Sequence, residues 1–189
     1  MIDLCPATED EMVLAFLKAE LNSPRFSSEY QIDRRTLVDS ADLGSPSQNA
    51  ARLNELRRVK GALFPPNVAW RRVALENGDL LRLKYANLDN WRRLSRHTRL
   101  VSDGAKNVHS MPDNPKLHIL AVAKEFQRGA TYPELIAVAG EEEGAGIILI
   151  EGHVRATAYA VAGWPGRTDC ILGTSSSAEQ WDHGYGCTH

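Results

Sequence analysis

The stretch from residue 147 to residue 159 constrains the fold of this chain more than any other. Residues 147–150 are all Ile or Leu, and after Glu151 and Gly152 the apolar residues follow helical spacing. An unbroken apolar run of this length is typical of a strand covered on both faces. The pattern therefore predicts a buried strand that turns through one glycine into a helix.

The segments around this strand and helix alternate between the two kinds of structure. Pro115 suits the first turn of a helix, and Gly129 is a typical helix end. The expected order is a helix over residues 115–129, a strand over 134–139, an acidic turn over 140–146, the strand over 146–150, a helix over 153–162 and a closing strand over 169–172. This order indicates an α/β (α+β) fold, in which helices pack on a small mixed sheet.

An N-terminal helical extension is expected before this domain. Thr8 and Glu11 have the spacing of a capping box, which predicts a helix from there to Leu21. A second helix is expected over residues 47–60, and residues 25–46 are expected to connect the two. Pro65 and Pro66 cannot continue a helix. We therefore divide the chain into an extension, residues 1–66, and a main domain, residues 67–189.

A hairpin is expected at the start of the main domain. Asn77-Gly78 readily adopts the positive φ angles of a type I′ turn, and strand-like residues flank it at 68–76 and 80–85. A helix over residues 88–99 and a loop over 102–114 should follow. After the closing strand we expect a polar loop over 173–177 and a frayed terminus over 183–189.

The composition is that of a globular protein without a membrane-spanning segment. Apolar residues make up 43% of the chain and charged residues 24%, which is ordinary for a chain with a core. The longest strongly apolar stretch falls far short of the roughly 20 residues that cross a bilayer. The acidic start differs from a secretory signal, and three widely spaced cysteines do not form a disulfide framework. We therefore expect a cytoplasmic protein that does not bind membranes.

Positive charge is concentrated in the middle of the chain. Residues 51–106 contain 13 Lys or Arg against 5 Asp or Glu, whereas the whole chain has a formal net charge of −2. Such a block could attract the phosphates of nucleic acid. The alternative is that these side chains line solvated faces and balance the acidic remainder. Trp70 and Trp91 lie in the block and could stack on bases, although core packing is the expected role for both.

The turn after residue 150 has the chemistry of an anion-binding site. The first turn of a helix presents backbone N–H groups without intrahelical partners, at the positive end of the helix dipole. Gly152 lets a ligand approach the backbone closely, and Arg155 can make a charge-assisted contact to phosphate oxygens. His153 could donate to a phosphate or act as a base. The alternative is an ordinary turn, with Glu151 favouring the helix N-terminus and Arg155 reaching into water.

The order of these elements and the segment Glu151-Gly152-His153-Val154-Arg155-Ala156-Thr157-Ala158-Tyr159 resemble the ParB/sulfiredoxin-like superfamily over residues 68–174. In ParB-type proteins the corresponding turn has a glycine followed by acidic and basic residues and helps to hold a nucleoside triphosphate, a pattern that Gly152 and Arg155 fit. In sulfiredoxins a Gly-Cys-His-Arg segment holds the catalytic cysteine and ATP. Gly152, Arg155 and Tyr159 match that segment, but His153 falls where the cysteine stands. Free-serine kinases of the superfamily use an acidic residue beside the phosphate loop, and Glu151 is the nearest candidate.

The resemblance implies a nucleotide-binding protein with Mg²⁺ as a cofactor. ATP or CTP would be held by Gly152, His153, Val154, Arg155 and Thr157, and Glu151 and His153 would be catalytic in phosphoryl transfer or nucleoside triphosphate hydrolysis. A small-molecule acceptor and a homodimer are both compatible with the sequence, and no helix-turn-helix region is expected. The alternative is a non-catalytic regulator that binds DNA or RNA through residues 51–106. No histidine pair has the close spacing of a zinc motif, so no protein metal site is expected.

Overall fold

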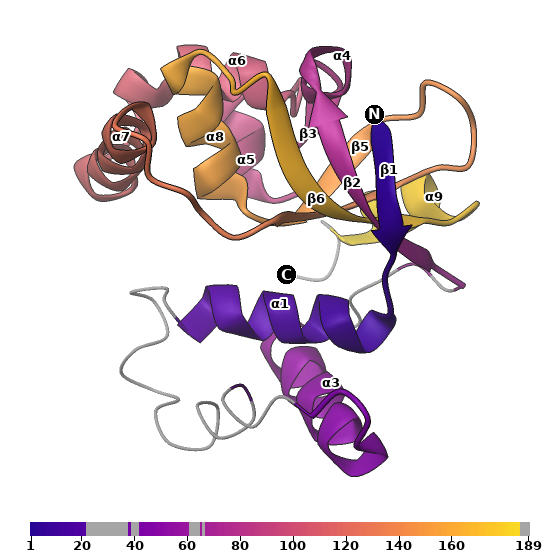
Figure 1. Cartoon of the computed structure of the whole chain (residues 1–189). Helices are drawn as coiled ribbons and strands as arrows, with labels where there is room; N and C mark the ends of the chain where they lie inside the picture. The colour runs from indigo at the N-terminus through magenta and orange to yellow at the C-terminus, as the bar shows by residue number, and fades with distance from the viewer. Residues whose placement is uncertain (22–37, 39–41, 61–64, 66, 186–189) are drawn as a thin grey trace.

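The computed structural model describes residues 1–21, 38, 42–60, 65 and 67–185 of the chain. Helices separate most of its strands along the sequence (Figure 1). In chain order the elements are β1 (Ile2–Pro6), α1 (Glu9–Leu21), α3 (Pro46–Lys60), β2 (Ala69–Glu76), α4 (Asn77–Leu80), β3 (Leu83–Lys84), α5 (Asp89–Leu94), α6 (Val101–Lys106), the 3-10 helix η1 (Val108–Ser110), α7 (Asp113–Gln127), β4 (Leu135–Ala139), β5 (Ile147–Glu151), α8 (His153–Ala162), β6 (Arg167–Thr174) and α9 (Ala178–Tyr185).

The strands in the described part of the chain form one mixed sheet in the order β1-β2-β6-β4-β5-β3. β2 pairs antiparallel with both β1 and β6, and β4 pairs antiparallel with β5. The pairs β4–β6 and β3–β5 are parallel. The expected α+β class with a small mixed sheet is therefore confirmed.

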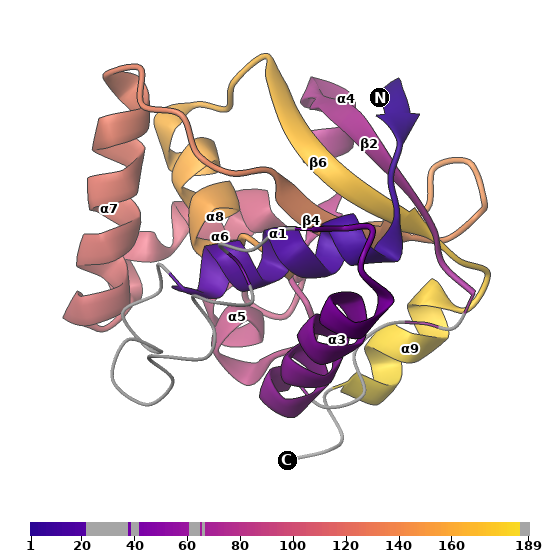
Figure 2. The same cartoon turned by 60° about the horizontal axis from the view of Figure 1, so that its bottom comes forward.

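Helices cover both faces of the sheet. On one face α5, α6, α7 and α8 pack over a core that includes Leu135, Leu149 and Leu172 (Figure 1). On the other face α1, α3 and α9 come forward in Figure 2, over a second core that includes Ile136 and Ile148. Successive residues of a strand point to opposite faces. The apolar strands β4 and β5 therefore supply both cores at once.

The capping box before α1 forms as predicted. Thr8 Oγ1 accepts the Glu11 backbone N–H at 3.2 Å, and the Glu11 carboxylate accepts the Thr8 N–H at 2.7 Å. Met12 and Phe16 of this helix are buried in the second core. Beside α1, the strand β1, which no sequence pattern indicated, pairs with β2. Residues on the two sides of the expected boundary at 66/67 thus share a sheet and a core.

The predicted hairpin around Asn77-Gly78 is wrong. These residues begin the short helix α4, and the strands on either side of it do not pair with each other, because β2 lies between β1 and β6 while β3 lies beside β5. Asp79 accounts for the difference. Its carboxylate accepts the Glu76 N–H at 3.0 Å and forms an ion pair with Arg82 at 2.7 Å. These contacts stabilise a helical turn where the local composition favoured a type I′ turn.

Other segments differ from prediction in helical content. The expected loop over residues 102–114 contains α6, η1 and the start of α7, and the chain after β6 continues into α9. The helix expected over residues 88–99 is shorter, because α5 ends at Leu94. The connection expected over residues 25–46 lies mostly outside the described residues. No helix in the described ranges combines the length and the apolar character needed to cross a membrane.

Candidate functional site at the start of helix α8

The turn between β5 and α8 has the backbone that the sequence predicts. Gly152 adopts a φ of +97° directly before His153, the first residue of α8. A Cβ at Gly152 would lie 2.5 Å from Leu135 Cδ2 and would also disfavour this φ. The first turn of α8 contains no acidic residue, and no side chain in the described part of the chain caps it. The positive end of the helix is therefore not neutralised by its own first turn.

Arg155 folds back over this turn instead of extending into water. Its Nη2 donates to the Glu134 carbonyl at 3.2 Å, and its Nη1 lies 3.8 Å from the Glu151 carboxylate. The side chains of Arg155 and Glu151 are only 13% and 16% exposed. The Nε of Arg155 is buried and finds no hydrogen-bond acceptor among the residues that the structure describes. A buried donor without an acceptor destabilises the fold, and an anionic ligand would supply that acceptor.

His153 packs into an aromatic cluster at the start of the helix. It is 8% exposed, and its ring centroid lies 5.3 Å from that of Trp91 and 6.0 Å from that of Tyr85. Its Nε2 accepts the Ala86 backbone N–H at 3.3 Å. A ring nitrogen that accepts this bond carries no proton, so the contact fits a neutral imidazole. The ring of His153 thus holds the segment after β3 against α8.

Thr157 is also engaged inside the protein. It is fully buried, and its Oγ1 donates to the His153 carbonyl at 2.6 Å and lies 2.7 Å from the Tyr85 hydroxyl. Because the single hydroxyl proton of Thr157 goes to the carbonyl, Tyr85 is the donor in the second bond. Burial raises the pKa of Tyr85, which keeps this donor protonated. Thr157 therefore fixes the first turn of α8, where Val154 is partly exposed.

Three side chains around the turn were not selected from the sequence as site residues: Tyr85, Trp91 and Arg99. Arg99 donates from Nη2 and Nε to the Tyr85 carbonyl at 2.9 and 3.1 Å. All three precede His153 by more than 50 residues, so no local spacing connects them with the turn. Their one signal in the sequence was the basic and aromatic composition of residues 85–99.

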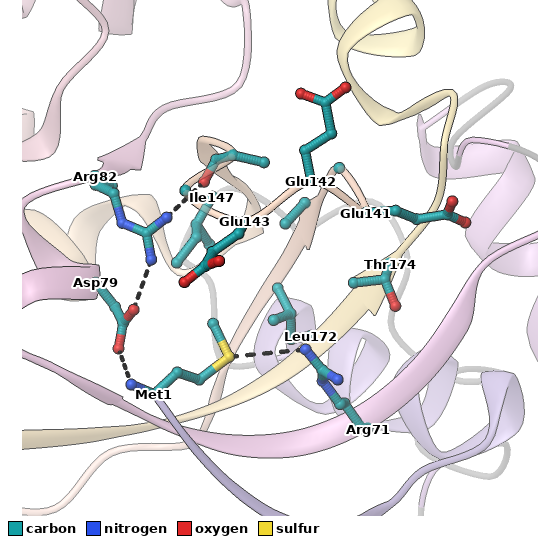
Figure 3. Close-up of a pocket in the computed structure, with 14 residues that line it drawn as sticks. Met1, Arg71, Asp79, Arg82, Glu141, Glu142, Glu143, Ile147, Leu172 and Thr174 are labelled. Carbon is teal, nitrogen blue, oxygen red and sulfur yellow. Dashed lines mark hydrogen bonds and ion pairs between the residues drawn. The ribbon is translucent and has the colours of Figure 1, made fainter.

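A separate cleft of about 350 Å³ lies at the other end of β5 (Figure 3). Ile147 lines it at the start of β5, whereas Gly152 follows the end of that strand, so the two places are roughly 15 Å apart. None of residues 151–157 lines the cleft. Its polar walls come mainly from Met1, Arg71, Asp79, Arg82, Glu143 and Thr174.

The two arginines of this cleft each form an ion pair, although the Arg71 Nε, like that of Arg155, has no hydrogen-bond acceptor in the described part of the chain. Arg82 contacts the Asp79 carboxylate at 2.7 Å, and Arg71 Nε lies 3.3 Å from the Asp3 carboxylate. Glu143 points into the cleft from the acidic turn between β4 and β5 (Figure 3). A cleft with paired guanidinium groups and a further carboxylate does not favour phosphate. We therefore place the candidate site at the start of α8.

Most basic side chains described between residues 51 and 106 are engaged within the protein. Arg72, for example, bridges Glu11 at 2.8 Å and Glu134 at 3.2 Å. Trp70 and Trp91 are 9% and 8% exposed, which confirms their core role and removes them as platforms for bases. The basic block as a whole is therefore not one free cationic surface.

The remaining chemistry-bearing side chains have structural or solvated roles. Cys170 is fully buried in β6, and burial raises the pKa of its thiol. His109 and His118 are exposed. Within the described ranges, no group of three or more His, Cys, Asp or Glu side chains is arranged to hold a metal ion.

Comparisons with protein-family models, with curated proteins and with solved structures found no match to this chain. The resemblance to the ParB/sulfiredoxin-like superfamily therefore rests on the residues of the α8 turn and on the order of the elements, and it stays a prediction.

Proposed function

We propose that this protein binds a nucleoside triphosphate, ATP or CTP, with Mg²⁺ at the first turn of α8, and that phosphoryl transfer or hydrolysis takes place there. The observation that carries the proposal is the buried Arg155 Nε, which lacks an acceptor in the described part of the chain and lies beside an uncapped helix N-terminus. The guanidinium of Arg155 and the backbone N–H groups of the helix N-terminus are both donors that favour an anion with several oxygens. The resemblance of residues 151–159 to ParB and sulfiredoxin turns supports a nucleotide as that anion.

In this proposal the phosphates lie against the backbone N–H groups of residues 152–155, and Arg155 exchanges its present partner for them. The bond from Arg155 to the Glu134 carbonyl is 3.2 Å long, at the long end of the hydrogen-bond range. A bidentate contact from a guanidinium to a phosphate is stronger than a bond to a neutral carbonyl. Binding therefore requires a side chain to turn and leaves the backbone of the site in place.

Glu151 is the group that would orient or deprotonate the acceptor or a water molecule. At 3.8 Å its contact with Arg155 is weak, so the carboxylate is released when Arg155 turns to the phosphates. Mg²⁺ is usually held by one or two carboxylates together with substrate phosphates and water. Glu151 and a triphosphate would provide such a set, which does not need the larger cluster of ligands that is absent among the described residues.

His153 and Thr157 take positioning roles in this proposal. The His153 Nε2 is occupied by the Ala86 N–H, and the Thr157 hydroxyl by the His153 carbonyl. This arrangement favours fixing the turn over proton transfer by His153, which the sequence suggested as a catalytic group. Val154 contributes its backbone N–H at the partly exposed side of the turn.

A thermal-shift titration with ATP, CTP and GTP, each with and without Mg²⁺, tests the binding. A ligand at ~100 times its Kd adds about 2.7 kcal/mol of stability, which for a chain of this length raises Tm by roughly 5–10 °C. Arg155→Gln should abolish the shift. Arg128→Gln, which removes an exposed arginine at the end of α7, should preserve it. Glu151→Gln should abolish phosphate release and, because Glu151 would also hold Mg²⁺, should keep the shift seen without Mg²⁺ while reducing the additional shift that Mg²⁺ gives.

The outcomes separate the two halves of the proposal. No shift with any nucleotide, or a shift that survives Arg155→Gln, contradicts nucleotide binding at this turn. A Mg²⁺-dependent shift without phosphate release or transfer to an acceptor contradicts the catalytic half and leaves a nucleotide-binding module.

A further inference from the structure

The C-terminus of helix α5 has a hydrogen-bond pattern in which the residue just past the helix is usually glycine. The His97 N–H reaches the Arg92 carbonyl at 2.8 Å, and the Arg96 N–H reaches the Arg93 carbonyl at 3.1 Å. These two bonds define a Schellman motif, whose residue just past the helix adopts the left-handed conformation. That residue is Arg96, with a φ of +51°.

The same chain places glycine at this position in two other helices. The ends of α7 and α8 show the same pair of bonds, and there Gly129 and Gly163 have φ values of +92° and +100°. A side chain disfavours this conformation because its Cβ approaches a carbonyl oxygen. Arg99 shares the strain, with a φ of +62°. An arginine at position 96 therefore weakens the fold where a glycine would fit.

Internal contacts hold residues 92–99, here called the basic loop, in one shape. The buried Ser95 hydroxyl donates to the Trp91 carbonyl at 2.8 Å and accepts the Arg99 N–H at 2.9 Å. The Arg99 guanidinium is bound to the Tyr85 carbonyl. Because the N–H groups of residues 95–99 are all used inside the protein, the loop can offer a partner mainly its exposed side chains.

Most of the positive charge on these side chains is not balanced by an ion pair in the described part of the chain. The basic loop contains four arginines and no acidic residue. Arg93, Arg96 and His97 are exposed and form no ion pair within the described part of the chain. Arg92 forms a pair with Asp89 at 3.4 Å, both side chains being well exposed. An exposed pair of this kind is weak, so Arg92 can change its partner.

We propose that the basic loop binds the phosphate backbone of duplex nucleic acid. Guanidinium groups stay charged and match the geometry of phosphate oxygens. Strained positions that the surrounding structure holds in place are characteristic of functional sites. Arg96 is such a position, since its side chain is exposed while its backbone is strained and its N–H is bonded within the protein.

The composition of the surface favours a duplex over other partners. Trp91 is 8% exposed and stacks on Tyr85, so it cannot receive an unpaired base as single-stranded binding requires. Protein interfaces centre on apolar anchor residues, and the large exposed hydrophobic side chains in the described part of the chain lie outside residues 89–106. Attachment through charge alone is the mode of binding to a phosphate backbone.

Fluorescence anisotropy of a short labelled DNA duplex with the full chain, between about 50 and 200 mM salt, tests the proposal. With two or three phosphates neutralised, the plot of log affinity against log salt should have a slope of about −2 to −3. Arg93→Gln and Arg96→Gln should each weaken binding and reduce the slope by about 0.9. Arg128→Gln, at the exposed end of α7, is the matched control and should change neither quantity.

Arg96→Gly separates a functional from a structural role of this arginine. It should raise Tm by about 2–4 °C, because the strain is relieved, and yet weaken DNA binding as much as Arg96→Gln does. Absence of binding at about 50 mM salt, unchanged binding in Arg96→Gly, or a Tm that does not rise would each overturn the proposal. Equal competition by polyglutamate and by unlabelled duplex would also overturn it, in favour of an acidic protein partner.

Discussion

Replacement of Thr157 by valine should destabilise this protein more than replacement of Tyr85 by phenylalanine, although each change removes one oxygen atom. The Tyr85 hydroxyl donates to Thr157 Oγ1 at 2.7 Å, and Thr157 donates to the His153 carbonyl at 2.6 Å. Both side chains are fully buried. The order of donors and acceptors therefore decides which group is left without a partner.

The expected magnitudes follow from that order. In Tyr85→Phe, Thr157 keeps its bond to the carbonyl, and the loss is about 1 kcal/mol for one hydrogen bond. In Thr157→Val, the tyrosine hydroxyl stays buried without an acceptor, which adds about 1–3 kcal/mol. In the double variant neither oxygen remains, so the loss should return to about 1–2 kcal/mol and fall well below the sum of the two single losses.

Urea unfolding of the four proteins of this cycle, followed by circular dichroism, measures these differences. Tryptophan fluorescence adds a local readout, because the Trp91 ring stacks on Tyr85 with centroids 4.7 Å apart. Additive losses, or a larger loss in Tyr85→Phe than in Thr157→Val, would refute the assigned donor order. They would also refute this account of how the first turn of α8 is held.

Two further predictions concern the backbone at Gly152 and the ion pair between Arg72 and Glu11. Gly152→Ala should destabilise the protein by about 2–4 kcal/mol, because it combines left-handed strain with a Cβ placed 2.5 Å from Leu135 Cδ2. Thermal unfolding should show little change for the control Gly166→Ala, where the added Cβ meets nothing within 4 Å. Equal effects at both positions would contradict the steric argument. The hydrogen bond from Arg72 lowers the pKa of Glu11 below its ordinary value of 4.5, so the stability from this pair is present above that value and is lost as pH falls through the lowered pKa. Arg72→Gln should therefore flatten the acid side of the stability profile in urea unfolding, and an unchanged profile would count against the pair.

Two helix boundaries were predicted correctly because the residues that fix them are local. The residues expected for the helix after Gly152 are the residues of α8, His153–Ala162, because glycines with positive φ lie on both sides of it. The capping box of Thr8 and Glu11 likewise located α1. In both cases the bonds that define the boundary lie within a few residues of one another.

Strand pairing could not be predicted in this way. β3 pairs with β5, which follows it by more than 60 residues, and no turn pattern encodes such a partner. The interpretation of Asn77-Gly78 as a hairpin was wrong because Asp79 and Arg82 stabilise a helical turn there. β1 was not predicted because its residues are exposed and its alternation of apolar and polar side chains stops after three residues, at Leu4.

The candidate site shows the same division between local and distant information. The turn through Gly152 and the position of Arg155 in the first turn of the helix were predicted from a single strand-to-helix segment. The burial of His153 was not, because Tyr85, Ala86 and Trp91 reach it from an earlier part of the chain. Whether a histidine at a helix start acts as a base or packs as a buried ring depends on neighbouring residues from other parts of the chain. The local segment does not specify those neighbours.

One peptide unit, between Tyr85 and Ala86, connects the first turn of α8 with the basic loop. Its N–H binds His153 Nε2 at 3.3 Å, and its carbonyl binds Arg99 at 2.9 Å. The Trp91 ring stacks on both Tyr85 and His153. A strained backbone persists where its surroundings over-determine it, and these contacts meet that condition for the basic loop. They also explain why His153 is buried: its ring packs between the two segments. In the two proposals made above, anions would be bound by Arg155 and the helix amides on one side and by the exposed arginines of the basic loop on the other.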